Sequence, residues 1–228
     1  MPFDWNGKRG KLVITILAGI LGNLLAYLST LLISPTPQIA FDLSHLATFA
    51  IAIAFGPYYG ALTGAIVAIY PYIHLGVLGS YGPFVGLPIF IGKAMTGYFC
   101  GLLARRVHPY LAVPISYIPE SLYTLLFLKA VQTWMLPDVL TWDVISNILI
   151  KGWIEVFILS LVLETVYRRR ILETAVLLLE IFIITLLVEK QGTYALALVL
   201  VLVFVIMVTI DLIDRYRGND KKDTQGPT

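Results

Sequence analysis

Long apolar runs, separated by short polar or helix-breaking segments, dominate the sequence. A helix needs about 20 apolar residues to cross the hydrocarbon core of a bilayer, and the first run, residues 12–33, has that length before Ser34-Pro35-Thr36-Pro37 ends it. Gly56-Pro57 divides the next apolar stretch, because proline suits the first turn of a new helix. The pattern predicts eight membrane-spanning helices, at residues 12–33, 43–55, 57–75, 89–103, 110–135, 142–167, 171–188 and 194–213, with an irregular glycine- and proline-rich loop at 76–88.

The composition agrees with a chain that lies mostly in lipid. Hydrophobic residues make up 58% of the 228 residues and charged residues only 13%, with a mean hydropathy of +0.85, whereas a soluble domain carries about 25% charged residues. We therefore expect an all-α, polytopic membrane protein. The net charge of +2 is too small to indicate nucleic acid, and the single cysteine excludes an intramolecular disulfide or a cysteine-based metal cluster. We expect no metal and no cofactor.

The positions of the basic residues predict the orientation, because Lys and Arg collect in cytoplasmic loops. With the N-terminus inside, twelve of the sixteen fall in inner segments, namely Lys8, Arg9, Lys11, Arg105, Arg106, Arg168, Arg169, Arg170, Arg215, Arg217, Lys221 and Lys222. This pattern predicts a multi-pass cell-membrane protein with both termini in the cytoplasm. The expected organisation is an N-terminus (1–11), a six-helix core (12–170), a C-terminal transmembrane hairpin (171–214) and a disordered cytoplasmic tail (215–228).

Several polar residues fall inside or beside the predicted spans, where an uncompensated charge costs several kcal/mol. Lys151 and Glu155 are four residues apart and therefore share a helix face, with Asn147 one turn earlier. Together with aromatic residues at a similar predicted depth, toward the outer face, they are typical of a small-molecule pocket. The candidate substrate-binding residues are Asp42, His45, His74, Tyr81, Phe84, Lys93, Trp134, Asn147, Lys151 and Glu155.

These residues also have structural interpretations. Lys151 and Glu155 could neutralise each other, Asp42 could cap the second helix, and Lys93 could extend to the headgroups. Aromatic belts occur at membrane interfaces in general. Four further glutamates are interpreted as helix–helix pairing or partner contacts toward the inner side, namely Glu120, Glu164, Glu173 and Glu180.

Small residues recur every four positions on the first predicted helix, at Ala18, Gly22 and Ala26. Such a strip lets another helix approach closely. The approaching helix is either part of another subunit or another helix of this chain. A similar surface on the third predicted helix is formed by Gly56, Gly60 and Gly64.

Two segments carry a resemblance to a known family. Phe41-Asp42-Leu43-Ser44 leads into the second predicted helix, and Ala54-Phe55-Gly56-Pro57-Tyr58-Tyr59-Gly60-Ala61-Leu62-Thr63-Gly64 joins the second to the third. A glycine-rich loop up to Gly92 follows, and then the small residues Gly97 and Gly101. In these features residues 11–170 resemble the S components, the substrate-specificity subunits of energy-coupling-factor (ECF) vitamin transporters.

The resemblance implies a six-helix core that binds a vitamin or related small metabolite near the outer face. The strip of Ala18, Gly22 and Ala26 would contact a membrane-embedded coupling subunit, which two cytoplasmic ATPases drive. The predicted C-terminal hairpin departs from the six-helix pattern of that family.

Motifs of other functional classes are missing from the sequence. The chain has no Gly-x-x-x-x-Gly-Lys-[Ser/Thr] loop, so the energy for transport would come from a partner. It also has no His-Glu-x-x-His or Gly-x-Ser-x-Gly motif, and we do not expect an enzyme. Two alternatives stay open, a non-catalytic membrane scaffold or assembly protein and, with less support because no internal repeat is apparent, a secondary transporter.

Overall fold

The computed structural model describes residues 7–32, 42–79 and 82–167, and every regular element in these ranges is helical. In chain order the elements are α1 (Lys8–Leu32), α2 (His45–Phe55), α3 (Pro57–Val67), α4 (Ile69–Pro71), the π-helical turn η1 (Tyr72–Val77), α5 (Pro83–Gly86), α6 (Pro88–Leu103), α7 (Pro109–Trp134) and α8 (Trp142–Tyr167). All of them belong to one compact unit, Met1–Ile181. The predicted hairpin (171–214) and tail (215–228) lie outside the described residues.

Five helical stretches in these ranges are long and apolar enough to cross a membrane. They are Lys8–Thr30, Pro57–Val77, Pro83–Leu103, Pro109–Trp134 and Trp142–Glu164. Helix α2 is apolar but has only 11 residues, which corresponds to about 16 Å of helix and roughly half of a hydrocarbon core. The prediction of an all-α, multi-pass membrane protein is confirmed at this level.

The distribution of exposed and buried side chains also fits a lipid environment. On α1 the large apolar side chains of Leu17 and Ile20 are 56% and 58% exposed, whereas Lys93 of α6 is only 3% exposed. A helix of a water-soluble protein shows the opposite arrangement. Cys100, also on α6, is fully buried.

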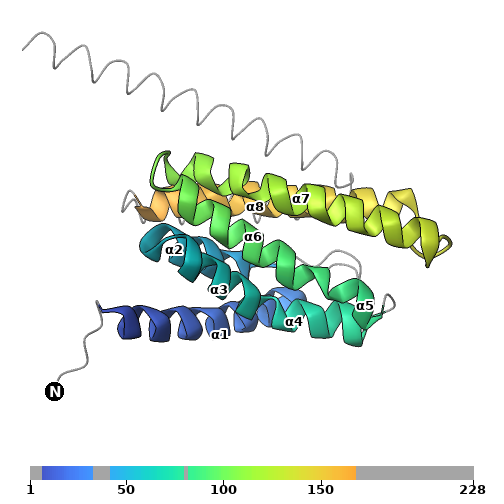
Figure 1. Ribbon diagram of the computed structural model, residues 1–228, viewed down its shortest axis with the longest axis horizontal. Coiled ribbons are helices and arrows are strands. Elements are labelled where there is room, and N and C mark those ends of the chain that lie inside the picture. The colour runs from blue at the N-terminus through green and yellow to red at the C-terminus, as the bar shows by residue number, and fades with distance from the viewer. Residues whose placement is uncertain (1–6, 33–41, 80–81, 168–228) are drawn as a thin grey trace, which may run out of the picture. The chain divides into compact units, whose positions relative to one another are not determined.

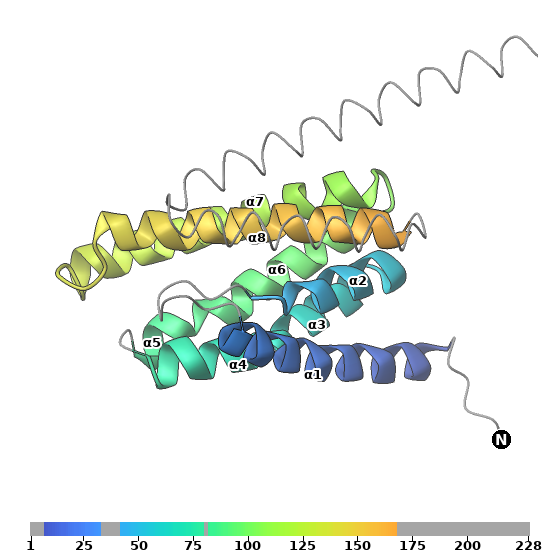
Figure 2. The same cartoon turned by 180° about the vertical axis from the view of Figure 1, so that it is seen from behind.

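The helices of this unit pack in three layers (Figures 1 and 2). Helix α1 forms one outer layer and contacts α2, α3 and α4, while α2, α3 and α6 contact one another in the middle layer. Helices α7 and α8 pair on the other side, where α7 contacts α6 and α8 contacts α2. Side chains of the middle layer can therefore meet those of α7 and α8.

Helices α3 and α6 make the most extensive of these contacts, and glycines allow their backbones to touch. A Cβ atom at Gly60 would collide with the carbonyl oxygen of Gly97, and one at Gly64 would collide with that of Lys93. Gly101 lies against the Gly56-Pro57 peptide in the same way. We call this contact the glycine seam; its members are Gly56, Gly60 and Gly64 on one side and Lys93, Gly97 and Gly101 on the other.

The chain turns sharply at Gly56, between α2 and α3. Gly56 has φ 96° and ψ −173°, a conformation that is open to glycine and strained for other residues. Pro57 begins α3 at the predicted position. The guanidinium of Arg105 lies over this turn, with Nη2 only 2.7 Å from the position that a Cβ atom of Gly56 would take.

Candidate functional site

A cluster of buried and half-buried polar side chains joins three distant segments of the chain. The Nζ atom of Lys93, on α6, donates hydrogen bonds to Asp42 Oδ2 at 2.5 Å and to Ser44 Oγ at 2.6 Å. The backbone N–H of Asp42 donates to Oε2 of Glu155, on α8, at 3.1 Å. We call Asp42, Ser44, Lys93 and Glu155 the polar centre.

Local structure positions the members of the polar centre. Asp42 Oδ1 accepts a hydrogen bond from the backbone N–H of Ser44 at 3.0 Å, so the same carboxylate stabilises the turn before α2 and binds Lys93. The glycine seam positions Lys93, because the carbonyl oxygen of Lys93 touches Gly64. Asp42 therefore combines the two roles that the sequence leaves open, a structural one at the start of α2 and a polar contact in the interior.

Glu120, on α7, adjoins the polar centre. Its carboxylate accepts a short hydrogen bond from Thr96 Oγ1 and lies 3.1 Å from the position of a Cβ atom on Gly92. It lies within electrostatic range of Lys93. The interpretation of Glu120 as a helix–helix pairing residue agrees with this contact between α7 and α6, although Glu120 lies close to the midpoint of α7 and not near its inner end.

Lys151 approaches the same region from α8, one helical turn before Glu155. It lies within electrostatic range of Glu155 and Asp42, although Lys151 forms no direct ion pair within the described ranges. With Glu120 included, three carboxyl groups and two ammonium groups share this part of the interior.

Aromatic rings lie next to the polar centre. Tyr117, on α7, makes edge-to-face contacts with His45 at 6.5 Å and with Trp153 at 5.1 Å between ring centroids. His45 Nδ1 and Glu155 Oε1 are buried without a hydrogen-bond partner among the described residues. Buried polar atoms of this kind normally bind water or a ligand.

The polar centre lies near the middle of the helices. Lys93 is the central residue of the stretch Pro83–Leu103, and Glu120 and Glu155 are close to the midpoints of α7 and α8. The sequence predicts a position toward the outer face, because it assigns residues 76–88 to a loop outside the span. In the structure η1 and α5 extend the neighbouring helical stretches into that region, so the same side chains lie deeper than predicted.

The structure brings together only part of the candidate set. The candidates that meet in this region are Asp42, His45, Lys93, Lys151 and Glu155. The candidates that lie away from it are His74, Phe84, Trp134 and Asn147. His74 stacks on Tyr70 at 5.6 Å between ring centroids, and Trp134 is 81% exposed. Tyr81 is outside the described residues.

The small-residue strip of α1 packs against other helices of this chain. A Cβ atom at Gly22 would lie 2.5 Å from Val67 and 3.1 Å from Ala47, and Ala26 is buried. This is the internal packing that the sequence leaves open as one of two interpretations. A helix of another subunit has no access to Gly22 or Ala26 in this arrangement, and only Ala18 is half-buried.

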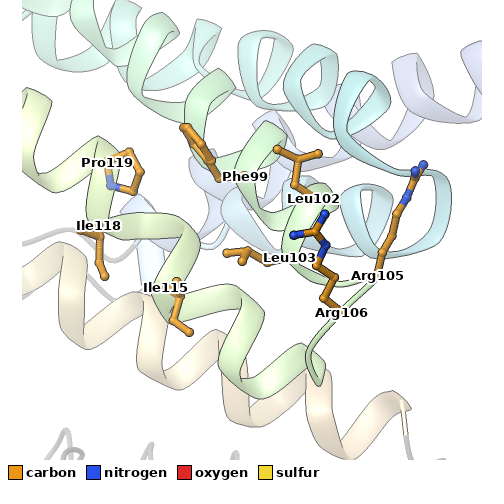
Figure 3. Close-up of a pocket in the computed structure, with 8 residues that line it drawn as sticks. All are labelled: Phe99, Leu102, Leu103, Arg105, Arg106, Ile115, Ile118 and Pro119. Carbon is orange, nitrogen blue, oxygen red and sulfur yellow. The ribbon is translucent and has the colours of Figure 1, made fainter.

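A cleft of about 530 Å³ lies apart from the polar centre, between α6 and α7 (Figure 3). Apolar side chains form its walls, and Arg105 and Arg106 lie at one end. None of the candidate substrate-binding residues lines this cleft.

Comparison of the chain with protein-family models, with curated proteins and with solved structures finds no match. Arguments about function therefore depend on the residues of the polar centre and on the chemistry that they allow.

Proposed function

We propose that the chain is the substrate-binding membrane subunit of an ECF-type importer, which captures a vitamin or related small metabolite and delivers it together with an ATPase-driven coupling module. One observation carries the proposal: ionisable side chains from three segments meet inside an apolar bundle, next to two buried polar atoms, His45 Nδ1 and Glu155 Oε1, without described partners. Ionisable groups at membrane depth are costly and are therefore typical of solute or ion pathways.

The charges around the polar centre indicate the chemistry of the solute. Lys93 is already bound within the polar centre, so the lysines alone are weak support for an anionic ligand. Three carboxyl groups face two ammonium groups when Glu120 and Lys151 are included. A solute with a hydrogen-bond donor or a positive charge beside a flat ring would complement Glu155 Oε1 and the ring of Tyr117.

The proposed arrangement has eight spans, formed by a six-helix core (12–170) and a hairpin (171–214), with both termini in the cytoplasm. Basic residues at one end of the described helices support it. Lys11, from the start of α1, lies 5.8 Å from the ring centre of Phe55, and Arg105, from the α6–α7 turn, lies over Gly56. Two separate cytoplasmic segments of the proposed topology thus meet at the α2–α3 turn, as the concentration of basic residues on one side requires.

The proposed coupling subunit needs a surface that is free of internal contacts. The exposed side of α1 provides one, since Leu17, Ile20 and Leu24 are exposed there while Gly22 faces α2 and α3. Because the sequence has no nucleotide-binding loop, the ATPases would be separate cytoplasmic chains.

Ligand binding to the purified full chain tests the proposal. A panel of vitamins is titrated by calorimetry against the natural chain and against Glu155→Gln, which keeps the shape and replaces the carboxyl group by an amide. A hydrogen bond contributes about 0.5–1.5 kcal/mol, so we expect the substitution to weaken binding by about 2- to 10-fold. Asn147→Ala, an exposed position two turns earlier on α8, is the matched control and should leave the affinity unchanged.

The same titration with Lys151→Ala decides whether that lysine contacts the solute, because an unchanged affinity removes it from the site. Copurification of the tagged chain with a coupling subunit and an ATPase pair would support the importer. Absence of both ligand binding and these partners would favour the scaffold alternative.

A further inference from the structure

The cleft between α6 and α7 is not explained by the polar centre. Its apolar walls are Phe99, Leu102 and Leu103 on α6 and Ile115, Ile118 and Pro119 on α7 (Figure 3). On both helices these positions follow an i, i+3, i+4 spacing, so each set shares one helix face over about one turn, and we call each set a stripe. The two stripes line the same cleft, and we call the space between them the channel.

Two arginines close one end of this channel. Arg105 and Arg106 lie in the turn between α6 and α7 and are part of the cleft lining. Figure 3 shows both arginines at the end of the cleft where α6 leads into the turn. The guanidinium of Arg105 lies over Gly56, between α2 and α3. In the part of the chain that the structure describes, neither guanidinium forms an ion pair with a carboxylate.

We propose that this cleft binds an anionic phospholipid, with an acyl chain along the apolar stripes and the phosphate group on Arg106 and Arg105. The turn joins two helical stretches that are long enough to span a membrane, so its guanidinium groups lie at the level of the headgroups and the stripes at the level of the acyl chains. Guanidinium groups bind phosphate oxygens through paired hydrogen bonds. A soluble anion would use only the arginines and an uncharged lipid only the walls, whereas an anionic lipid uses both.

Lipid titrations of the full chain in detergent test this proposal. Dioleoylphosphatidylglycerol and dioleoylphosphatidylcholine have the same acyl chains and differ in net charge, and native mass spectrometry measures how much of each is bound. A basic side chain near an anionic lipid surface contributes about five-fold in affinity. We therefore expect the natural chain to prefer the anionic lipid by about 5- to 25-fold.

Substitutions locate the preference in the cleft. Arg106→Gln should lower it about five-fold, and Arg106→Gln combined with Arg105→Gln should abolish it. Arg9→Gln makes the same charge change at an exposed position at the start of α1 and should leave the preference intact. Leu102→Trp, which fills the channel and keeps both arginines, should weaken the binding of both lipids.

Equal binding of the two lipids by the natural chain would overturn the proposal, as would a preference that survives the double arginine substitution. Loss of the preference in Arg9→Gln as well would assign it to general charge attraction, and would likewise overturn it. A variant is included in the comparison only if its melting temperature equals that of the natural chain. If the double variant does not fold, Leu102→Trp decides, because anionic-lipid binding that is unaffected by a filled channel places the lipid elsewhere.

Discussion

The polar centre and the glycine seam both hold α6 against its neighbours, yet they do so by opposite means. The seam brings backbones into contact, with nothing between Gly60 and Gly97 or between Gly64 and Lys93. The polar centre uses long charged side chains and hydrogen bonds of 2.5 to 3.1 Å between three segments. Lys93 belongs to both, since its carbonyl oxygen lies in the seam and its ammonium group in the polar centre.

The comparison shows how this chain replaces the hydrophobic force between helices, which lipid does not supply. The seam fixes how closely two helices approach, and added volume should therefore damage it. The polar centre determines which side chains meet, and an unbalanced charge should therefore damage it. The three substitutions below test this difference.

Removing the ammonium group of Lys93 should lower the free energy of unfolding by the largest amount. Lys93→Met keeps the length of the side chain and leaves the half-buried carboxylate of Asp42 without its ammonium partner. Breaking a buried ion pair in this way costs about 3–5 kcal/mol, which denaturant unfolding in detergent measures as a lower free energy of unfolding. Adding Asp42→Asn to Lys93→Met should restore part of the lost free energy of unfolding. If the losses of free energy of unfolding in Lys93→Met and Asp42→Asn simply add in the double variant, the two charges do not interact.

Adding one methyl group to the glycine seam should lower the free energy of unfolding somewhat less than Lys93→Met does. Gly64→Ala places a Cβ atom against the carbonyl oxygen of Lys93, and overpacking of this kind costs about 1–3 kcal/mol. Unfolding in the same detergent measures the loss. Ala54→Val is the control, because it adds volume at an exposed position of α2. An undamaged Gly64→Ala variant would show that the two helices can separate without loss of stability.

Removing an uncharged interior contact should have the smallest effect. Asn23, on α1, donates to the carbonyl oxygen of Ile66 at 2.8 Å and accepts from the N–H of Tyr70 at 2.7 Å. Hydrogen bonds between helices in membranes contribute about 0.6–1.7 kcal/mol. Asn23→Leu should therefore lower the free energy of unfolding by about 1 kcal/mol. A loss as large as that of Lys93→Met would remove the distinction between charged and neutral interior contacts.

Hydropathy predicts most of the described helix boundaries, because apolar length and the Gly56-Pro57 break determine where spans begin and end. It also detects Lys93 and Glu155, since a charge within an apolar run is conspicuous. Glu120 is equally conspicuous, but its partner is not predictable. The position of Glu120 along α7 predicts its depth in the bundle, whereas its contact with Thr96 depends on how α7 is rotated about its axis.

Rotation also explains which candidates lie away from the polar centre. Four residues turn a helix by about 400°, so each such step moves the side chain about 40° around the axis. Asn147 is two steps from Glu155 and is therefore about 80° away, on an exposed side of α8. Ser44 and Tyr117 are missed for a different reason. Such residues are common in and beside apolar helices, and only their three-dimensional neighbours set them apart.

The buried position of Cys100 has a practical consequence for mapping the chain in living cells. It is the only thiol in the sequence and has no exposed surface, so water-soluble maleimides should not reach it in the folded protein. The natural chain thus serves as its own unreactive background. A cysteine introduced at Arg9 or at Lys129, both exposed, would become the single labelled position and report the side of the membrane on which it lies.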